Sequence, residues 1–512
     1  MSAMTLLAMT APNFFCNAQA ADKNCRVLTR QGIYNGFVDK RGVKTWLGIP
    51  YAKPPVGKLR WHAPEKLSDG NGEFDAKNFG TTPPQDIDKF ETASINSQSE
   101  DCLTLNIWTR GGKNLPVMIF IPGGGFINGG TSDPLYNCAK LAARHDVLFV
   151  TINYRLNIFG SLNLAAIDPN FEGTGNLCIQ DQVAALRWVK ENISEFGGDP
   201  DNITVFGESA GSISTMLLTV TPAAKNLFGK AIAQSGHLGF YHTFDYSAQL
   251  AEKFMHASDC KNIRELLSKS TEELKAAYMT LIEGRPFLTE VDFMPTCDGK
   301  FLPEHPLAEL KNGAARGIKF MSGTTVDEYY YWALYFDNLP EIFPDFHTEL
   351  ALAIYEGEFE TVQSVYETWQ KNHPREDYLE FANQLDWRVG QELTAEYQSA
   401  FNDVYYYLFS QKSSIKNLDS CHAIDLPFVF GNPSDDVEAH PSEKLIKQVQ
   451  AAWISFAKTG NPNNPLIPNW QPYGADNRQT MEINSKRWTA HKDLNNDNLA
   501  ELRGVYESYL LD

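Results

Sequence analysis

A serine between two glycines, in the segment GESAGS at residues 207–212, separates an apolar run from a helical one. The residues before it, ITVFG, are typical of a buried strand, and the residues after it, SISTMLLTV, of a helix. A strand that enters a helix through so tight a turn has no room for side chains, which explains Gly207 and Gly211. The turn would hold Ser209 in a strained backbone conformation with its hydroxyl exposed, as in a nucleophile elbow.

Short apolar runs bounded by glycine, proline or asparagine recur along the chain and predict buried strands of a largely parallel sheet. These runs cover residues 116–121, 146–154, 202–207, 230–236, 318–323 and 403–410. A helical pattern covers residues 181–196, with apolar side chains on one face and Asp181 placed to cap its start. Strands in alternation with helices predict an α/β fold in which helices flank a central, mostly parallel sheet.

The 512 residues are enough for several domains, but no linker rich in glycine, serine or proline and no internal repeat divides them. We expect one domain over residues 22–512, with large helical insertions at about 245–315 and 330–400. An open α/β sheet leaves a crevice for ligands at the carboxyl ends of its strands. The insertions are expected over that crevice, and plain peripheral packing is the alternative.

The first twenty residues carry no charged side chain, contain an apolar stretch and end in Ala18, Gln19 and Ala20, the small-x-small pattern of a signal cleavage site. Residues 1–21 are therefore predicted to be a secretory signal peptide, which would make the protein secreted or periplasmic. No Lys or Arg precedes Lys23, so a disordered tail on a cytoplasmic protein is the alternative.

The net charge of -19 disfavours nucleic acid and acidic lipid surfaces as partners, because no basic stripe offsets it. No apolar run approaches the roughly 18 to 20 residues that span a bilayer. A small molecule is the expected partner, and the oligomeric state is open.

The 8 cysteines contain no Cys-x-x-Cys pair, and the histidines lack the His-Glu-x-x-His spacing, so no metal site is predicted. Cleavage after Ala20 would remove Cys16 and leave at least one thiol unpaired.

A serine hydroxyl is a weak nucleophile unless a base takes its proton, so a carboxylate and a histidine are expected later in the chain. Asp327 and Glu328 lie just past the 318–323 strand, and His422 lies in the loop after the 403–410 strand. Each stands where the carboxyl end of a strand would deliver it to one site. The residues alone leave the choice between the two carboxylates open.

The segment IPGGGFINGG follows the 116–121 strand and supplies backbone N–H groups that side chains do not cover. Such groups can stabilise the oxyanion that develops during acyl transfer. A phosphate-binding loop is the competing interpretation, but it requires a lysine after the last glycine. Thr131 follows Gly130 here, which disfavours phosphate binding.

Many blocks of this chain, in one order over roughly residues 25–510, resemble the type B carboxylesterases, a family that includes cholinesterases and bacterial para-nitrobenzyl esterases. They include GIPYAKPPVGKLRW, SEDCLTLNIW, PVMIFIPGGGF, VTINYRLNIFGSLN, LRWVKENISEFGGDPDNITVFGESAGS, DEYYYW, CHAIDLPFVFG and WISFAKTGNPN. The resemblance implies the α/β-hydrolase fold and hydrolysis of a small-molecule ester by a serine carboxylesterase that requires no cofactor.

The resemblance also assigns roles to individual residues. It implies Ser209 as nucleophile, His422 as general acid and base, Glu328 rather than Asp327 as the acidic member, the N–H groups of Gly124, Gly125 and Ala210 as oxyanion donors, and Glu208 and Ser235 as buried supporting residues. An amidase or thioesterase could use the same machinery, and a non-catalytic adhesion protein is the more distant alternative.

The chain departs from the family pattern at three places. The segment FGTTPPQ lacks the cysteine that usually pairs with the one at Cys102, so that disulfide is not expected. Tyr329 follows Glu328 and opens an aromatic cluster that ends at Trp332, which could line a binding gorge or belong to the core. Pro122 replaces the family's His or Tyr before the three glycines and should stiffen the loop.

Overall fold

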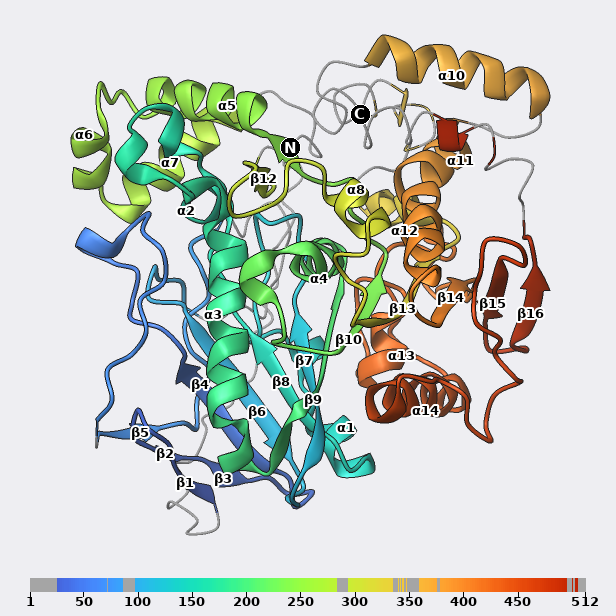
Figure 1. Cartoon of the computed structure of the whole chain (residues 1–512), viewed down its shortest axis with the longest axis horizontal. Helices are drawn as coiled ribbons and strands as arrows, with labels where there is room; N and C mark the ends of the chain where they lie inside the picture. Colours follow the sequence, from blue (N-terminus) through green and yellow to red (C-terminus); the bar gives the residue numbers. More distant parts are fainter. Residues whose placement is uncertain are drawn as a thin grey trace, which may run out of the picture.

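An 11-stranded sheet lies at the centre of the computed structural model (Figure 1). The structure describes residues 25–70, 72–85, 97–282, 293–334, 339, 341, 343–344, 347, 359–374, 378–494, 500 and 502–504. From one edge to the other, the strands are β16 (Thr489–Lys492), β15 (Gln479–Ile483), β14 (Val404–Phe409), β13 (Lys319–Thr325), β10 (Lys230–Gln234), β9 (Gly198–Glu208), β7 (Leu115–Ile121), β8 (Leu148–Ile152), β6 (Thr104–Thr109), β4 (Lys44–Pro50) and β3 (Phe37–Val38).

The middle of the sheet, from β15 to β8, is parallel throughout, and both edges are antiparallel. All the predicted strands lie in this parallel part, as β7, β8, β9, β10, β13 and β14. Their sequences are mostly apolar because parallel strands are covered on both faces. The prediction of a mostly parallel sheet flanked by helices is therefore confirmed.

The side chains of β7 alternate between two cores. Ile119 and Ile121 belong to a core with α3 (Leu177–Asn192) and α4 (Ala210–Val220), whereas Met118 and Phe120 belong to one on the opposite face. Helices α1 (Ala139–Arg144), α13 (Leu426–Phe430) and α14 (Glu443–Thr459) contribute to that second core. In Figure 1, α3 and α4 lie in front of the strands.

The helix predicted over residues 181–196 begins earlier, at Leu177, so the prediction that Asp181 caps its start is wrong. Asp181 lies inside α3, fully buried, where its carboxylate accepts hydrogen bonds from Nε and Nη2 of Arg155 at 2.8 and 2.7 Å. A buried carboxylate is stable only when it is paired, and Arg155 is the partner that the helical pattern did not reveal.

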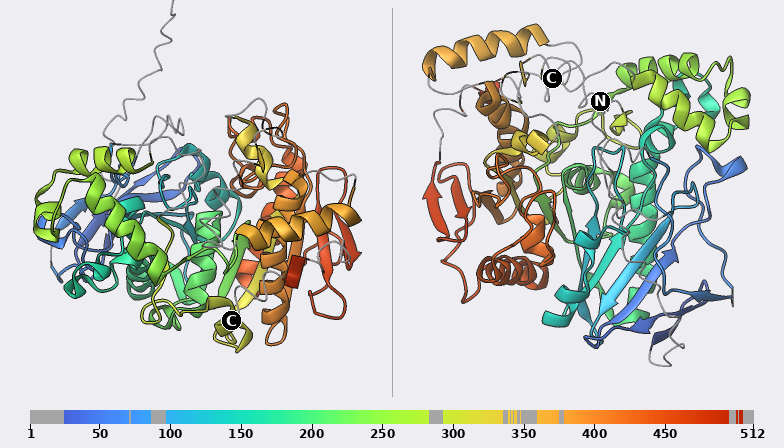
Figure 2. Two further views of the ribbon diagram at one scale, coloured as in Figure 1. Left: turned by 90° about the horizontal axis from the view of Figure 1, so that it is seen from above. Right: turned by 180° about the vertical axis from the view of Figure 1, so that it is seen from behind.

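Two sets of helices lie between strands of the sheet, in the segments where insertions were predicted. The first contains α5 (Phe244–Ala257), α6 (Ile263–Ser268), α7 (Thr271–Ile282) and α8 (Pro306–Lys311). The second contains the 3-10 helix η10 (Glu328–Leu334), α10 (Phe359–Asn372), α11 (Tyr378–Ala382), the π-helix η11 (Asn383–Val389) and α12 (Gly390–Ser399). Figures 1 and 2 show α5 to α7 and α10 to α12 at the same end of the molecule.

The described chain also contains smaller elements besides several short 3-10 helices. They include α2 (Asn157–Ser161), a sheet of β1 (Arg26–Leu28), β2 (Ile33–Asn35) and β5 (Glu73–Asp75), and the pair β11 (His242–Thr243) and β12 (Thr296–Cys297). Among the described residues, no helix is both long and apolar enough to cross a bilayer. The described cysteines are all buried and form no disulfide with one another, Cys102 included. The predicted signal peptide lies outside the described residues.

Candidate active site

The elbow at Ser209 joins the end of β9 to the start of α4. Ser209 has φ 56° and ψ -127°, a backbone conformation that non-glycine residues rarely adopt. The residue is partly exposed. A Cβ on Gly207 would lie 2.3 Å from the carbonyl carbon of Gly211, and one on Gly211 would lie 2.0 Å from the carbonyl oxygen of Ile121. Glycine is therefore the only residue that fits at both positions.

The glycine loop, residues 123–125, lies directly beside this elbow. A Cβ on Gly123 would come 3.0 Å from Cβ of Ser209, and Gly124 and Gly125 have φ of 112° and 60°. Within the part of the chain that the structure describes, the backbone N–H groups of Gly124, Gly125 and Ala210 donate no hydrogen bond. Three N–H groups near one serine are thus free to bind an oxygen atom of a ligand.

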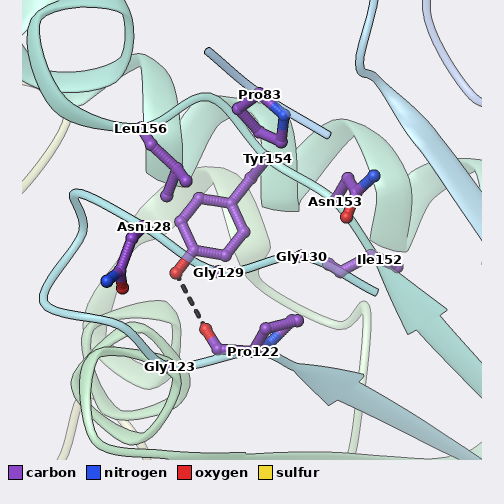
Figure 3. A pocket seen from close by; sticks show the side chains of 10 residues that line it. All are labelled: Pro83, Pro122, Gly123, Asn128, Gly129, Gly130, Ile152, Asn153, Tyr154 and Leu156. Atoms are coloured by element: carbon purple, nitrogen blue, oxygen red, sulfur yellow. Dashed lines mark hydrogen bonds between the residues drawn. The ribbon is translucent and has the colours of Figure 1, made fainter. Parts of the chain in front are cut away.

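The loop is fixed from behind by Tyr154, whose hydroxyl donates to the carbonyl oxygen of Pro122 at 2.8 Å (Figure 3). Tyr154, Asn128 and the loop residues Pro122 and Gly123 all line a small cavity at this place. The carbonyl of Gly124 accepts from the N–H of Asn128 at 3.0 Å. These contacts hold the glycine loop in one conformation.

His422 lies in the loop between β14 and α13, and its Nδ1 is 2.5 Å from Oε2 of Glu328. Glu328 is the first residue of η10, and its Oε1 accepts from the N–H of Thr325 at 2.8 Å. Both side chains are buried. Asp327 instead accepts from the backbone N–H of Ser420 at 3.1 Å, so of the two predicted carboxylates Glu328 is the one that pairs with His422.

The second ring nitrogen of His422 faces the elbow. Its Nε2 lies 3.0 Å from Oε1 of Glu208, the residue before Ser209, but off the direction of a hydrogen bond. Nε2 makes no hydrogen bond to any described residue, and none joins it to Ser209. Catalytic hydrogen bonds are often long or misaligned in the absence of substrate. The nitrogen is thus placed next to the elbow and is free to exchange a proton there.

Buried carboxylates set the charge of the imidazole. Burial by itself would lower the pKa of His422, but the carboxylates of Glu208 and Glu328 outweigh it and hold that pKa above its ordinary value. Burial also raises the pKa of Glu208. A positive charge on His422 is therefore stabilised at this position, which is what a base needs after it has taken a proton.

A further acidic residue, Asp425, lies three positions after His422 and is fully buried. Its Oδ2 accepts from Nε2 of Gln234 at 2.8 Å and from the hydroxyl of Tyr407 at 3.1 Å, and burial raises its pKa to about 6. Ser235 is also fully buried, and its hydroxyl makes no hydrogen bond to any described residue. Ser235 was predicted from the sequence, whereas Asp425 was not, because its only signal is its offset from His422.

Aromatic rings enclose the imidazole. The ring of Trp332 lies nearly parallel to that of His422, with centroids 5.9 Å apart, and the Trp387 centroid lies 4.6 Å away. Tyr329 and Trp332, at the two ends of the predicted aromatic cluster, both belong to the buried core, and Trp332 also packs on His422. Trp387 comes from η11, far along the chain, and no motif identified it.

Residues 24–501 match the model of the carboxylesterase family, so the chain belongs to that family. The chain is 38% identical to the para-nitrobenzyl esterase of Bacillus subtilis (strain 168), over 90% of this chain and 95% of that protein. It is 30% identical to an acetylcholinesterase of Danio rerio, over 94% of this chain and 88% of that one.

Solved structures agree with this membership. A thermophilic para-nitrobenzyl esterase superimposes with a TM-score of 0.82 at 35% identity, covering 93% of this chain and 99% of that one. A carboxylesterase of Geobacillus stearothermophilus gives 0.81 at 34% identity, with the same coverage. The predicted family and the α/β-hydrolase fold are confirmed, and the chain is a serine carboxylic ester hydrolase.

Proposed function

We propose that this enzyme hydrolyses small-molecule esters through an acyl-enzyme on Ser209, with His422 as general acid and base and Glu328 as its acidic partner. One observation carries the proposal: the imidazole of His422 lies against Glu328 through Nδ1, while Nε2, beside Glu208 at the Ser209 elbow, makes no hydrogen bond to any described residue. A nucleophilic serine requires a base that a third group orients in this way, with one ring nitrogen left to take the serine proton.

In the first step, Nε2 of His422 takes the hydroxyl proton while Oγ of Ser209 forms a bond to the ester carbonyl carbon. The carbonyl electron pair moves onto its oxygen, which accepts hydrogen bonds from N–H groups at the glycine loop and the helix start. Gly124, Gly125 and Ala210 are the proposed donors, because their N–H groups are free in the described chain. Losing one donor of this kind typically costs about 2.7 to 4 kcal/mol in the barrier.

The intermediate then collapses as the imidazolium of His422 gives its proton to the leaving alkoxide, and an acyl-enzyme remains. Water repeats the sequence: His422 takes a proton from water, the hydroxide attacks the acyl carbon, and Ser209 recovers its proton. Glu328 keeps the Nδ1 proton in place and stabilises the imidazolium without itself becoming protonated.

Replacement of Ser209 by alanine tests the proposal. Ser209→Ala should fold normally and lose at least about 10³-fold in kcat on a short-chain p-nitrophenyl ester. Ser214→Ala is the matched control, since Ser214 is a buried serine of α4 whose hydroxyl bonds to Gln182. It should keep kcat within a few fold. A Ser209→Ala enzyme with near-normal turnover would refute the assignment.

A thioester is the second candidate substrate, since the fatty acyl-CoA hydrolase precursor of Anas platyrhynchos is 31% identical over 91% of this chain. Measurement of kcat/KM for an ester and a thioester that share one acyl group would show which substrate class the enzyme prefers.

A further inference from the structure

A second cluster of buried polar side chains lies next to the triad, around Asp386 of η11. Its Oδ2 accepts a hydrogen bond from the hydroxyl of Tyr329 at 2.5 Å and lies 2.6 Å from Nε2 of His347. Asp386 and His347 have no exposed surface, and Tyr329 is 1% exposed. Hydrogen bonds to a carboxylate in such surroundings are short and strong.

Asp386 is linked to Glu328 and to His422, in each case through one neighbouring residue. Tyr329 directly follows Glu328, the carboxylate that holds Nδ1 of His422. Trp387 directly follows Asp386 and packs its ring 4.6 Å from the imidazole. A single carboxylate thus connects the segment that carries the acid to the helix that supports the imidazole.

The backbone around Asp386 is held as well. The side-chain oxygen of Asn383 accepts from the N–H of Tyr329 at 2.9 Å, and the carbonyl of Asp386 accepts from Nε2 of His237 at 2.7 Å. A Cβ on Gly390 would come 2.3 Å from the ring of His237, so the two are in close contact. π-Helical turns such as η11 are rare and frequently found at functional sites.

We infer that Asp386 is a positioning residue for the triad: through Tyr329 and Trp387 it fixes the relative placement of Glu328 and His422. This inference rests on the proposed roles of Glu328 and His422. Asp386 touches neither substrate nor reacting atoms. Its effect is geometric, since a displacement of about 1 Å at a reacting group can cost roughly 100-fold in rate.

Tyr329→Phe is the direct test, because it removes one hydroxyl and leaves the ring in its packing. The expected result is a kcat about 10-fold lower, with KM within about twofold of the wild type. A role limited to stability would lower Tm and leave kcat unchanged.

Tyr378→Phe is the matched control, since the hydroxyl of Tyr378 bonds to Nδ1 of the same His347, at 3.0 Å, on the side away from Asp386. It should lower Tm about as much as Tyr329→Phe while kcat stays within about twofold of the wild type.

A double-mutant cycle sharpens the test. If Tyr329 and Asp386 act through one bond, combining Tyr329→Phe with Asp386→Asn should lower kcat no further than the poorer single variant. Additive losses, or a Tyr329→Phe enzyme with normal kcat, would overturn the inference. If Asp386→Asn does not fold, Tyr329→Phe and its control decide alone. Ser209→Ala separates the two proposals, because an inactive Ser209→Ala beside a fully active Tyr329→Phe refutes only the positioning role.

Discussion

The two halves of the site are held in place by different means. Around Ser209, residues 121–125 and 207–211 fit together backbone against backbone, with Cβ atoms excluded at several points. Around His422, side chains from three distant segments meet through hydrogen bonds, buried charge and ring contacts. The Ser209 half requires that no side chain occupy the glycine positions, whereas the His422 half requires specific side chains. Substitutions should therefore damage the two halves in different ways.

The largest effect is expected in the backbone half, from Gly211→Ala. The new Cβ would lie 2.0 Å from the carbonyl oxygen of Ile121, so α4 would have to separate from the end of β7. Overpacking of this kind costs about 1–3 kcal/mol or more, and here the atom that it meets is backbone, which has little freedom to move. We expect a clearly lower Tm together with loss of activity.

Gly229→Ala serves as the control for this prediction, because a Cβ on Gly229 would meet nothing within 4 Å. Its Tm and kcat should match those of the wild type. A Gly211→Ala enzyme of normal Tm would show that the elbow tolerates atoms that the geometry excludes.

The next largest effect is expected in the histidine half, from Glu328→Gln. An amide has the shape of the carboxylate but cannot stabilise the imidazolium, and in a Ser-His-Asp triad this change lowers kcat about 10⁴-fold. We expect a loss of about 10³ to 10⁴-fold here, with Tm nearly unchanged. Unlike Gly211→Ala, this variant should lose activity while its fold stays intact.

Asp327→Asn is the companion variant, because the Asp327 carboxylate bonds to the N–H of Ser420 and not to His422. Its kcat should stay within a few fold of the wild type. Equal losses in Asp327→Asn and Glu328→Gln would mean that the carboxylates act as a pair.

The difference between the halves also explains what the sequence could predict. The elbow and the glycine loop are each a short continuous segment of the chain, so their chemistry is visible as GESAG and GGG. The apolar strands before them are continuous segments as well. Part of this pattern is set within the turn, where a Cβ on Gly207 would meet Gly211, and part is set where the elbow meets the glycine loop, as with Gly211 against Ile121.

The surroundings of His422 could not be predicted in the same way. Asp425 accepts hydrogen bonds from Gln234 and Tyr407, and Trp387 packs on His422 itself, so these contacts join separate segments of the chain. The start of α3 was misplaced for the same reason, since Asp181 resembles a helix cap until its buried partner Arg155 is known. Polar residues reveal their roles only when the fold brings their partners together.

Glu208 is where the two halves meet, and Glu208→Gln should have the smallest of these effects. The residue ends β9 beside Ser209, yet its carboxylate lies 3.0 Å from Nε2 of His422. Burial opposes a charged imidazole, and the carboxylates of Glu208 and Glu328 together raise the pKa of His422 above its ordinary value. Removal of one of these charges must lower that pKa again.

His422 accepts the serine proton only when it is neutral, so the acid limb of kcat/KM follows its pKa in the free enzyme. In Glu208→Gln this limb should move to lower pH, by about one unit, while kcat on the alkaline side falls only a few fold because the imidazolium is less stabilised. The pH dependence of kcat/KM for a neutral ester measures both. A limb that stays in place would mean that Glu208 is protonated in the active enzyme, so that its charge does not reach His422. A limb that moves to higher pH would contradict the prediction. It would mean that the Glu208 carboxylate does not raise the pKa of His422.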